Sequence, residues 1–173
     1  MKRTALALLS ALALALPATT ASAAAPEQLG VFNDWSVYRS TSTDGTVCYA
    51  LSKPTASDPK TVKRDPIYFL ISSWPEKGVK GEPSVVPGYP YKEKSMVTVE
   101  VGSDSFQFYT KNRETDCGAW LQETSEEQRL LDAMRRGSSM IVKGTSRRGT
   151  LTTDEYSLKG ISAALDKMAA DCK

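Results

Sequence analysis

Alternation between apolar and polar side chains is the feature of this sequence that most restricts its fold. The pattern is clearest from Met96 to Thr110, where Val97, Val99 and Val101 occupy every second position. The run Gly102-Ser103-Asp104-Ser105 interrupts it, and two phenylalanines then resume it. Because successive side chains of a strand point to opposite faces, this segment predicts two half-buried strands joined as a hairpin.

The same period recurs over much of the remaining chain. Val47, Tyr49 and Leu51 are predicted to form the apolar face of one strand. Prolines and glycines crowd the segment from Gly78 to Pro90, which is therefore predicted to be a long loop or an irregular edge. The strands predicted outside the hairpin are 34–38, with Trp35 and Val37 on one face, 47–51, 67–71, 140–144 and 150–158.

Two segments change to helical spacing. The run Thr124-Ser125-Glu126-Glu127-Gln128 fits a capping box, an apolar stripe follows it, and Gly137 supplies a stop. Near the end of the chain a second apolar stripe recurs at i, i+3, i+4, i+7 and i+8, and Cys172 falls almost on the same face. The two stripes are Leu130, Leu131 and Met134, and then Ile161, Ala164, Leu165, Met168 and Ala169.

These elements indicate a mainly β protein, an antiparallel β-sandwich with two short helices, one of them C-terminal. Hydrophobic residues make up 40% of the chain and charged residues 24%, which is typical of one globular domain. No internal repeat and no strong linker divides the sequence. We therefore expect residues 24–173 to form a single β-sandwich domain.

Residues 1–23 have the features of a secretory signal peptide. Lys2 and Arg3 precede an apolar run from Ala5 to Leu16, and Ala21-Ser22-Ala23 supplies small residues for cleavage after Ala23. The apolar run is shorter than the roughly 20 residues that span a bilayer, so a retained anchor is the less favoured alternative. We expect a periplasmic, secreted or cell-surface protein with no transmembrane segment after cleavage.

Charge and composition exclude several function classes. Removal of Lys2 and Arg3 reduces the 22 basic residues to 20, which equals the 20 acidic residues, so the mature chain is formally neutral. It lacks the excess positive charge that supports non-specific binding to nucleic acid. The chain contains no histidine, which removes Ser-His-Asp and Cys-His catalysis and histidine metal ligation. We expect no enzymatic activity, no cofactor and no metal site.

Three cysteines, Cys48, Cys117 and Cys172, lie in a chain addressed to a compartment where disulfides form. Three pairings are possible, each leaving one thiol. We favour Cys48 with Cys172, because this bridge attaches the end of the chain to an early strand and closes a long loop. Cys117 is then a free thiol or a dimer link. A nucleophilic role for Cys117 is disfavoured, because the neighbouring Asp116 raises rather than lowers a thiol pKa.

Two exposed segments are the candidate contact sites. The proline-containing sequence around Tyr89, Tyr91 and Lys92 presents aromatic rings in a predicted loop. Arg147 and Arg148 lie at a predicted turn tip, where guanidinium groups can bind carboxylate or phosphate oxygens. These five are the candidate binding residues. The competing interpretation is a pair of solvated turn charges and a set of core aromatic rings.

Other motifs favour structural interpretations. The adjacent carboxylates Asp154-Glu155 and Glu126-Glu127 point in different directions in a strand or helix, so surface charge is favoured over a catalytic pair. Lys143-Gly144-Thr145 lacks the spacing of a phosphate-binding loop. The tryptophans at positions 35, 74 and 120 fit either a carbohydrate or peptide groove or the core, and for Trp35 the core is favoured.

Several motifs resemble the invasion-associated locus B family of bacterial secreted proteins. The residues that carry the resemblance are 33–38, 48–50 and 88–92, and above all Val142 to Thr150 and Asp154 to Gly160. The similarity extends over about residues 29–172. The run Asp116-Cys117-Gly118 departs from the family pattern, so no role for Cys117 is carried over.

The resemblance implies an immunoglobulin-like β-sandwich, export, and in pathogenic members a link to host-cell entry. It implies no catalytic residues. We therefore expect a non-enzymatic periplasmic or surface-associated protein that binds a protein or another envelope or cell-surface component. The alternatives are a carboxylate-based envelope hydrolase and a structural envelope-stress factor. The ligand and the oligomeric state are not determined by the sequence.

Overall fold

The computed structural model describes residues 25–113 and 117–172 of the 173-residue chain. The predicted signal peptide and its cleavage after Ala23 lie outside the described residues. None of the helices within the described residues has the length and apolar character needed to cross a membrane.

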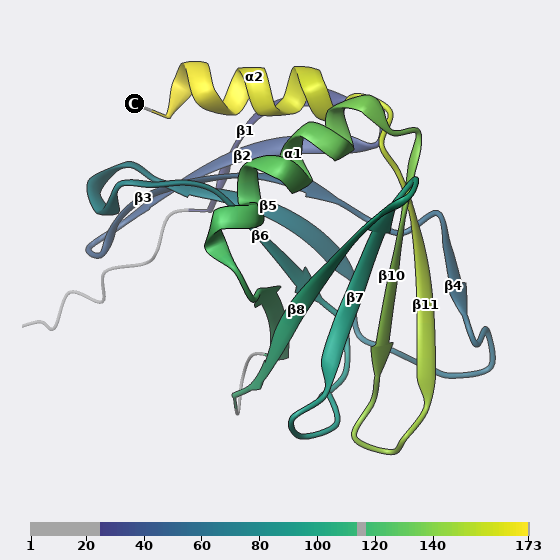
Figure 1. Cartoon of the computed structure of the whole chain (residues 1–173). Helices are drawn as coiled ribbons and strands as arrows, with labels where there is room; N and C mark the ends of the chain where they lie inside the picture. Colours follow the sequence, from purple (N-terminus) through teal and green to yellow (C-terminus); the bar gives the residue numbers. More distant parts are fainter. Residues whose placement is uncertain (1–24, 114–116, 173) are drawn as a thin grey trace, which may run out of the picture.

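The described residues form an antiparallel β structure with two α-helices (Figure 1). Two short 3₁₀ turns are also present: η1 (Pro75–Lys77) follows β5, and η2 (Thr124–Glu126) precedes α1. The α-helices are α1 (Glu127–Arg136) and α2 (Ile161–Asp171). The strands are β1 (Glu27–Phe32), β2 (Trp35–Ser42), β3 (Gly45–Ser52), β4 (Ala56–Asp58), β5 (Tyr68–Trp74), β6 (Val79–Val86), β7 (Met96–Val101), β8 (Asp104–Asn112), β9 (Cys117–Leu121), β10 (Ser139–Thr145) and β11 (Leu151–Ser157).

The strands of the described chain are hydrogen-bonded in the order β1-β2-β3-β5-β6-β9-β8-β7-β10-β11-β4. This continuous sheet folds over so that its two halves face each other. The ring centroid of Phe69 on β5 lies 6.3 Å from that of Phe108 on β8 and 5.9 Å from that of Tyr156 on β11. The predicted antiparallel sandwich with two helices is confirmed, and the structure adds that its two layers are one sheet.

The hairpin predicted from alternation is confirmed as β7 and β8. Val97, Val99 and Val101 are buried, as are Phe106 and Phe108. The turn contains Gly102 with φ of +58°, a left-handed conformation that glycine adopts without a steric penalty.

The face of β3 that points into the core differs from the expectation. Cys48 and Ala50 are fully buried, whereas Val47, Tyr49 and Leu51 are only half-buried on the outer face. Helix α2 packs against β3, so this strand turns its smaller side chains inward to make room for the helix.

The segment from Gly78 to Pro90 was expected to be a loop or an irregular edge, and that expectation is wrong for most of its length. It contains β6, in which Gly81, Pro83 and Val85 alternate as buried residues. Pro83 pairs with Ile71 of β5 but lies outside the two-residue ladder between β6 and β9. Proline has no N–H group for a ladder hydrogen bond, and sheets tolerate it where a strand is paired on one side only.

Helix α1 ends as predicted but begins differently. No side-chain hydrogen bond caps its start, so the predicted capping box does not form. The helix ends at Arg136, and Gly137 has extended rather than left-handed backbone angles. A Cβ on Gly137 would lie 2.8 Å from Val101 Cγ1 and 2.9 Å from Leu158 Cδ1, so close packing is what requires glycine there.

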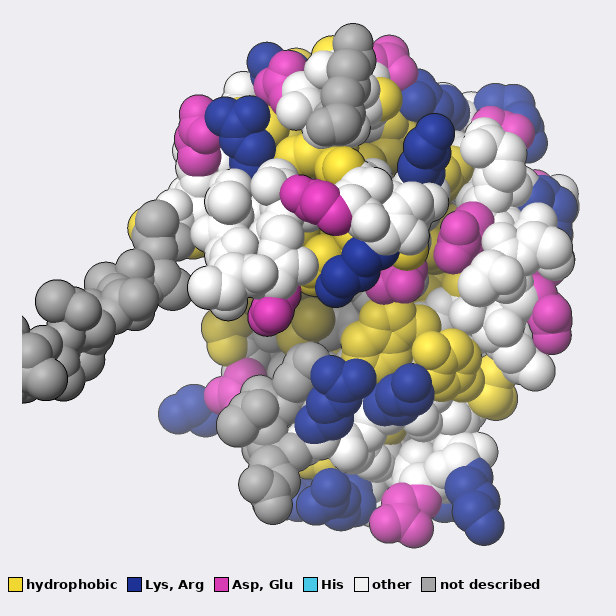
Figure 2. Space-filling view, turned by 90° about the vertical axis from the view of Figure 1, so that its left-hand side faces the viewer, with side chains coloured by type: hydrophobic (Ala, Val, Ile, Leu, Met, Phe, Trp, Pro, Cys, Tyr) yellow, Lys and Arg dark blue, Asp and Glu magenta, His cyan; other side chains and the backbone are white. Residues whose placement is uncertain are grey.

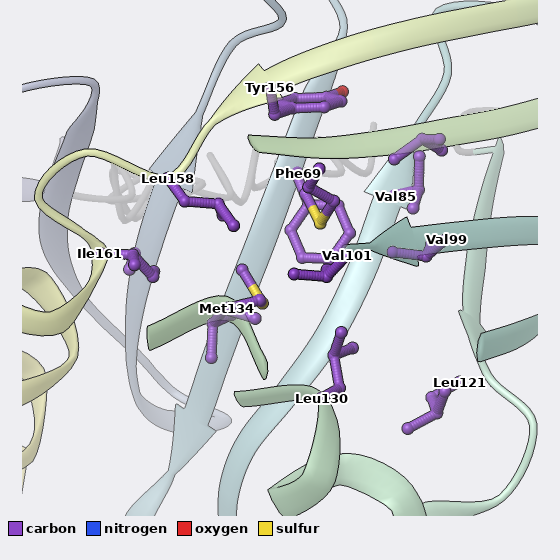
Figure 3. Packing of buried hydrophobic residues seen from close by; sticks show 14 of the residues in the cluster. Phe69, Val85, Val99, Val101, Leu121, Leu130, Met134, Tyr156, Leu158 and Ile161 are labelled. Carbon is purple, nitrogen blue, oxygen red and sulfur yellow. The ribbon is translucent and has the colours of Figure 1, made fainter. Parts of the chain in front are cut away.

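Helix α2 follows most of its predicted stripe: Ile161, Ala164, Leu165 and Met168 are buried, whereas Ala169, which was predicted to share that face, is exposed. Both helices lie at one end of the molecule (Figure 1). Figure 3 shows their side chains, among them Leu130, Met134 and Ile161, in the same cluster as Phe69 and Tyr156 from the sheet. The helices therefore close one end of the core that the two layers of the sheet enclose.

The predicted disulfide between Cys48 and Cys172 is present, with 6.1 Å between the two Cα atoms. It connects the end of α2 to β3. Cys117 is a free, half-buried cysteine in the described chain.

Replacing Cys48 and Cys172 with serine should lower the free energy of unfolding by about 4 kcal/mol, because the bridge restricts the unfolded chain across a separation of 124 residues. Urea unfolding followed by tryptophan fluorescence measures the loss. Cys117→Ser is the matched control and should leave stability within about 0.5 kcal/mol. Equal stability of the double variant and the control would contradict this account of the bridge.

Candidate functional site

The two segments predicted to make contacts lie side by side. Arg147 N–H donates to the Pro90 carbonyl at 2.8 Å, and Lys92 N–H donates to the Thr145 carbonyl at 2.9 Å. Tyr91 and Ser146 form an isolated β-bridge between these two bonds. The turn that joins β10 to β11 is thus held against the loop before β7, at the end of the molecule opposite the helices (Figure 1).

A half-open pocket of about 320 Å³ lies where these segments meet. A third segment, which precedes β5, completes its wall. The lining residues are Val62, Lys63, Arg64, Asp65, Gly88, Tyr89, Pro90, Ser146, Arg147, Arg148, Thr150 and Thr152. Four of these side chains are cationic and one is a carboxylate, so the pocket carries a net positive formal charge.

Three of the five candidate binding residues line this pocket: Tyr89, Arg147 and Arg148. Lys92 is exposed on the adjacent loop but is not one of the lining residues. The expectation that Tyr91 is exposed is wrong, because its side chain is only 1% exposed. Asn112 holds the Tyr91 backbone through hydrogen bonds to both its N–H and its carbonyl, so this tyrosine anchors the loop inside the core.

Arg64, which lines the pocket, forms an ion pair that the sequence did not indicate. Arg64 donates from both terminal nitrogens to the two carboxylate oxygens of Asp154, each at 2.7 Å. Its Nε and Nη2 also donate to the Pro87 carbonyl at 2.9 and 2.7 Å. The side chains of Arg64 and Asp154 are 7% and 3% exposed. The interpretation of Asp154 as a surface charge is therefore wrong, whereas its neighbour Glu155 is exposed as expected.

Tyr89 forms a rigid wall above this ion pair. Its ring centroid lies 4.8 Å from the Arg64 guanidinium carbon, within the range of a cation–π contact. Its hydroxyl shares a 2.6 Å hydrogen bond with the Thr152 hydroxyl. Burial raises the pKa of Tyr89, so the phenol stays neutral at physiological pH. Tyr89 can therefore present an apolar ring and no charge to a bound group.

Gly88 sets the position of this loop. Its φ of +72° is a left-handed conformation, and a Cβ at this position would overlap the Asp65 carbonyl. The Gly88 carbonyl in turn accepts a hydrogen bond from Asp65 N–H at 3.0 Å. This close approach brings the segment of Lys63, Arg64 and Asp65 to the edge of the pocket.

Some cations of the pocket already have partners within the fold and others do not. The hydrogen bonds that the Arg64 guanidinium donates go to Asp154 and to the Pro87 carbonyl, so its charge is balanced by Asp154 inside the fold. Within the described residues, Lys63, Arg147 and Arg148 take part in no ion pair. Asp65 is the one opposing carboxylate at the rim. This arrangement can hold an anionic group, because guanidinium and ammonium groups bind carboxylate and phosphate oxygens strongly.

The remaining candidates from the sequence lie elsewhere. Trp35 is fully buried, as favoured, and its indole N–H donates to the Ser157 carbonyl at 3.0 Å. Trp74 and Trp120 are half-buried. The described residues contain no group of three or more histidine, cysteine, aspartate or glutamate side chains placed to hold a metal ion.

Asp154→Asn should destabilise the protein by about 3–5 kcal/mol, because it leaves the buried Arg64 guanidinium without its counter-charge. Glu155→Gln is the matched control on the exposed neighbour and should change stability by less than about 0.5 kcal/mol. The double variant Arg64→Met with Asp154→Leu should be more stable than Asp154→Asn. Chemical unfolding measures all three. A loss in Asp154→Asn no larger than in Glu155→Gln would show that the pair contributes nothing.

The hydroxyl of Tyr156 is buried and has no hydrogen-bond partner among the described residues. Burial, and then the nearby Asp154 carboxylate, raise the pKa of Tyr156 well above its ordinary value of 10.0. Burial likewise raises the pKa of Tyr91. Both phenols therefore stay protonated in the folded chain at a pH where they ionise in the unfolded chain.

Stability should consequently be constant below about pH 10, as far as these tyrosines contribute, and should fall as the pH rises above it. Tyr156→Phe should leave stability unchanged or increase it by about 1 kcal/mol at pH 7, since it removes an unpaired buried hydroxyl. The same substitution should reduce the loss between pH 9 and 11. Urea titrations at each pH test this, with Tyr38→Phe on the half-buried outer face as the control. An unchanged alkaline slope in Tyr156→Phe would contradict the assignment.

Comparisons with known proteins match this chain over most of its length. A family model described as invasion associated locus B (IalB) protein matches residues 35–169. Among solved structures, the chain is similar to the crystal structure of invasion associated protein b from Bartonella henselae. The sequence identity is 13%, the TM-score is 0.57, and the match covers 85% of this chain and 97% of that chain. At this identity the structural similarity concerns the fold. No curated protein matches.

Proposed function

The chain belongs to the invasion associated locus B family, and we propose that it is an exported, non-enzymatic binding protein of the bacterial envelope or cell surface. We propose further that it recognises an anionic group of its partner in the pocket formed by Tyr89, Arg147 and Arg148. A role in host-cell entry, in line with the family description, belongs to this proposal and follows from a partner on the cell surface.

The observation that carries the proposal is the convergence of separate segments on one cationic pocket. Arg147 and Arg148 come from the β10–β11 turn, and Lys63 comes from a segment more than eighty residues earlier in the sequence. The backbone bonds between the Pro90 loop and the Arg147 turn fix the geometry before any ligand arrives. A preformed site of this kind loses little conformational entropy on binding.

Export is supported by features independent of the pocket. Residues 1–23 have the composition of a secretory signal peptide. The disulfide between Cys48 and Cys172 fits an oxidising compartment. Both favour the periplasm or the cell surface as the location.

The arrangement of carboxylates favours binding over the alternative of a carboxylate-based hydrolase. Asp154, the most buried carboxylate beside the pocket, accepts two hydrogen bonds from Arg64, so both of its oxygens are engaged inside the fold. A hydrolase of that class needs a protonated acid and a second carboxylate across a cleft. Asp65 is the one carboxylate that lines the pocket, so a pair of that kind is not assembled there. A structural envelope-stress factor, the other alternative, would need no ligand in this pocket.

Titration with inorganic phosphate and with acetate, followed by backbone amide NMR, tests the pocket directly. We expect chemical-shift changes centred on 146–150 and 88–90, and we expect the Arg147→Ser, Arg148→Ser double variant to weaken phosphate binding by about tenfold. The matched control is Arg136→Ser with Lys159→Ser, which removes two exposed charges elsewhere and should bind phosphate as the unmodified chain does.

Shifts spread over all exposed cations, with the two double variants behaving alike, would remove the anion-binding proposal.

A separate experiment identifies the biological partner: a photo-crosslinking residue replaces Arg148 in intact cells. Crosslinks that depend on Arg147 would support recognition through this pocket. The structural alternative would be favoured by a different result. Gene deletion would make cells sensitive to envelope stress, and the Arg147→Ser, Arg148→Ser variant would fully restore their resistance.

A further inference from the structure

A second surface, on the outer face of the sheet, carries a row of mostly apolar side chains, with Ser84 at its centre, that no helix or strand of the described chain covers. Cross-strand pairing places Leu51 beside Leu70, Leu70 beside Ser84, Ser84 beside Trp120, and Trp120 beside Tyr109. Met96 continues the row on β7 and is 39% exposed. The other apolar members are half-buried, because they cover one another.

A parallel row lies next to it and ends in a lysine on each side. Lys53 directly follows β3, and its ammonium lies 5.9 Å from the ring centroid of Tyr68. Tyr68 pairs with Val86. One position beyond the last paired residues of β6 and β9, Val85 and Ala119, side-chain alternation places Val86 and Gly118 on this same face. Gly118 pairs with Lys111, whose ammonium lies 5.1 Å from the ring centroid of Tyr109.

Together the two rows form a shallow surface with aromatic ends, which we call the outer aromatic face. The side chains at the centre of this face are small, because Ser84 and Gly118 lie there. A Cβ on Gly118 would lie 2.7 Å from the Trp120 ring. Trp120 and Tyr109 lie with ring planes at 29° and centroids 6.1 Å apart. From β3 to β8 the face crosses four strand spacings, or about 19 Å. A ligand that contacts both ends of this face must therefore be extended.

The cations at the two ends are available. Neither Lys53 nor Lys111 forms an ion pair within the described chain. Each is held over an aromatic ring, so a bound anion would neutralise a cation that is already positioned. On the face seen in Figure 2, hydrophobic side chains lie together, and Lys and Arg side chains as well as Asp and Glu side chains border them. An uncovered apolar surface of this kind is unusual on a soluble domain unless it binds something.

We propose that the outer aromatic face binds an acidic glycan chain. The sugar rings lie with their C–H faces on Leu70, Val86 and the rings of Trp120 and Tyr109. The carboxylate or sulfate groups lie at Lys53 and Lys111. This site is separate from the pocket of Arg147 and Arg148 and does not depend on it.

The chemistry of the face favours a glycan over a peptide strand. At Leu70, Ser84, Trp120 and Tyr109 the strands are paired on both sides, so this row offers no free backbone edge to an added peptide strand. Recognition has to use side chains alone, and these are aromatic rings, small residues and two lysines. Sugars offer both an apolar ring face and repeated anionic groups along an extended chain.

Isothermal titration with a heparin-derived dodecasaccharide tests this proposal. We expect the Lys53→Glu, Lys111→Glu double variant to weaken binding by at least about tenfold. The control is Lys60→Glu with Lys159→Glu, which changes the net charge equally at exposed lysines that contact no ring, and it should weaken binding by less than about threefold. Trp120→Ala should weaken binding and Trp120→Phe should restore most of it, with thermal unfolding used to confirm that both variants are folded.

Three outcomes overturn the proposal. The first is equal weakening by the two lysine double variants, which would indicate non-specific attraction. The second is binding of a single-stranded DNA dodecamer as tightly as the dodecasaccharide, which would indicate a nucleic-acid surface. The third is loss of dodecasaccharide binding in the Arg147→Ser, Arg148→Ser variant with the outer aromatic face intact, which would place the glycan in the pocket. Retained phosphate binding in the Lys53→Glu, Lys111→Glu variant would show that the pocket proposal stands independently.

Discussion

The closure of one β-sheet over its own inner face is the constraint on which the rest of this structure depends. Phe69 of β5 contacts Phe108 and Tyr156 from the opposite half of the sheet, so the two layers share a single core. Burial of that core is the main favourable term available to a domain of this size. Helices α1 and α2 close one end, and the disulfide holds α2 against β3. The connecting loops, the pocket and its charges lie at the other end, which neither of these two helices covers.

At the end of the molecule opposite the helices, a buried polar interaction lies close to the packed rings of Tyr89 and Tyr91. Arg64 and Asp154 are almost completely buried, and each satisfies the other together with the Pro87 carbonyl. The pair fixes the segment before β5 against β11 and supports the ring of Tyr89 above it. The free cations Arg147 and Arg148 are then presented on a rigid base. A buried pair of this kind specifies position more than it adds stability, because desolvation offsets much of the attraction.

The two proposed binding surfaces use the sheet in different ways. The pocket is made by loops at the end of the molecule opposite the helices, whereas the outer aromatic face is made by strand side chains whose spacing the pairing register sets. Half-buried residues such as Leu51 and Trp120 had weak signals in the sequence, since their alternation resembles that of a core face. The register alone shows that they point outward. A protein with both surfaces could hold an anionic group and an extended chain at once, on elements that need not move.

The sequence by itself determined the local structure: the β7–β8 hairpin, the buried stripe of α2, and an inward-facing Cys172 suited to a bridge with Cys48. The hairpin and the stripe follow from a periodicity that extends over a few residues. The disulfide was chosen among only three possible cysteine pairs. The inward face of β3 and the strand β6 were decided by packing against α2 and by pairing with β5. The partnership of Arg64 with Asp154, 90 residues apart, and the burial of Tyr91 were decided by tertiary structure alone. No local pattern encodes such contacts, because they exist only once the sheet has closed.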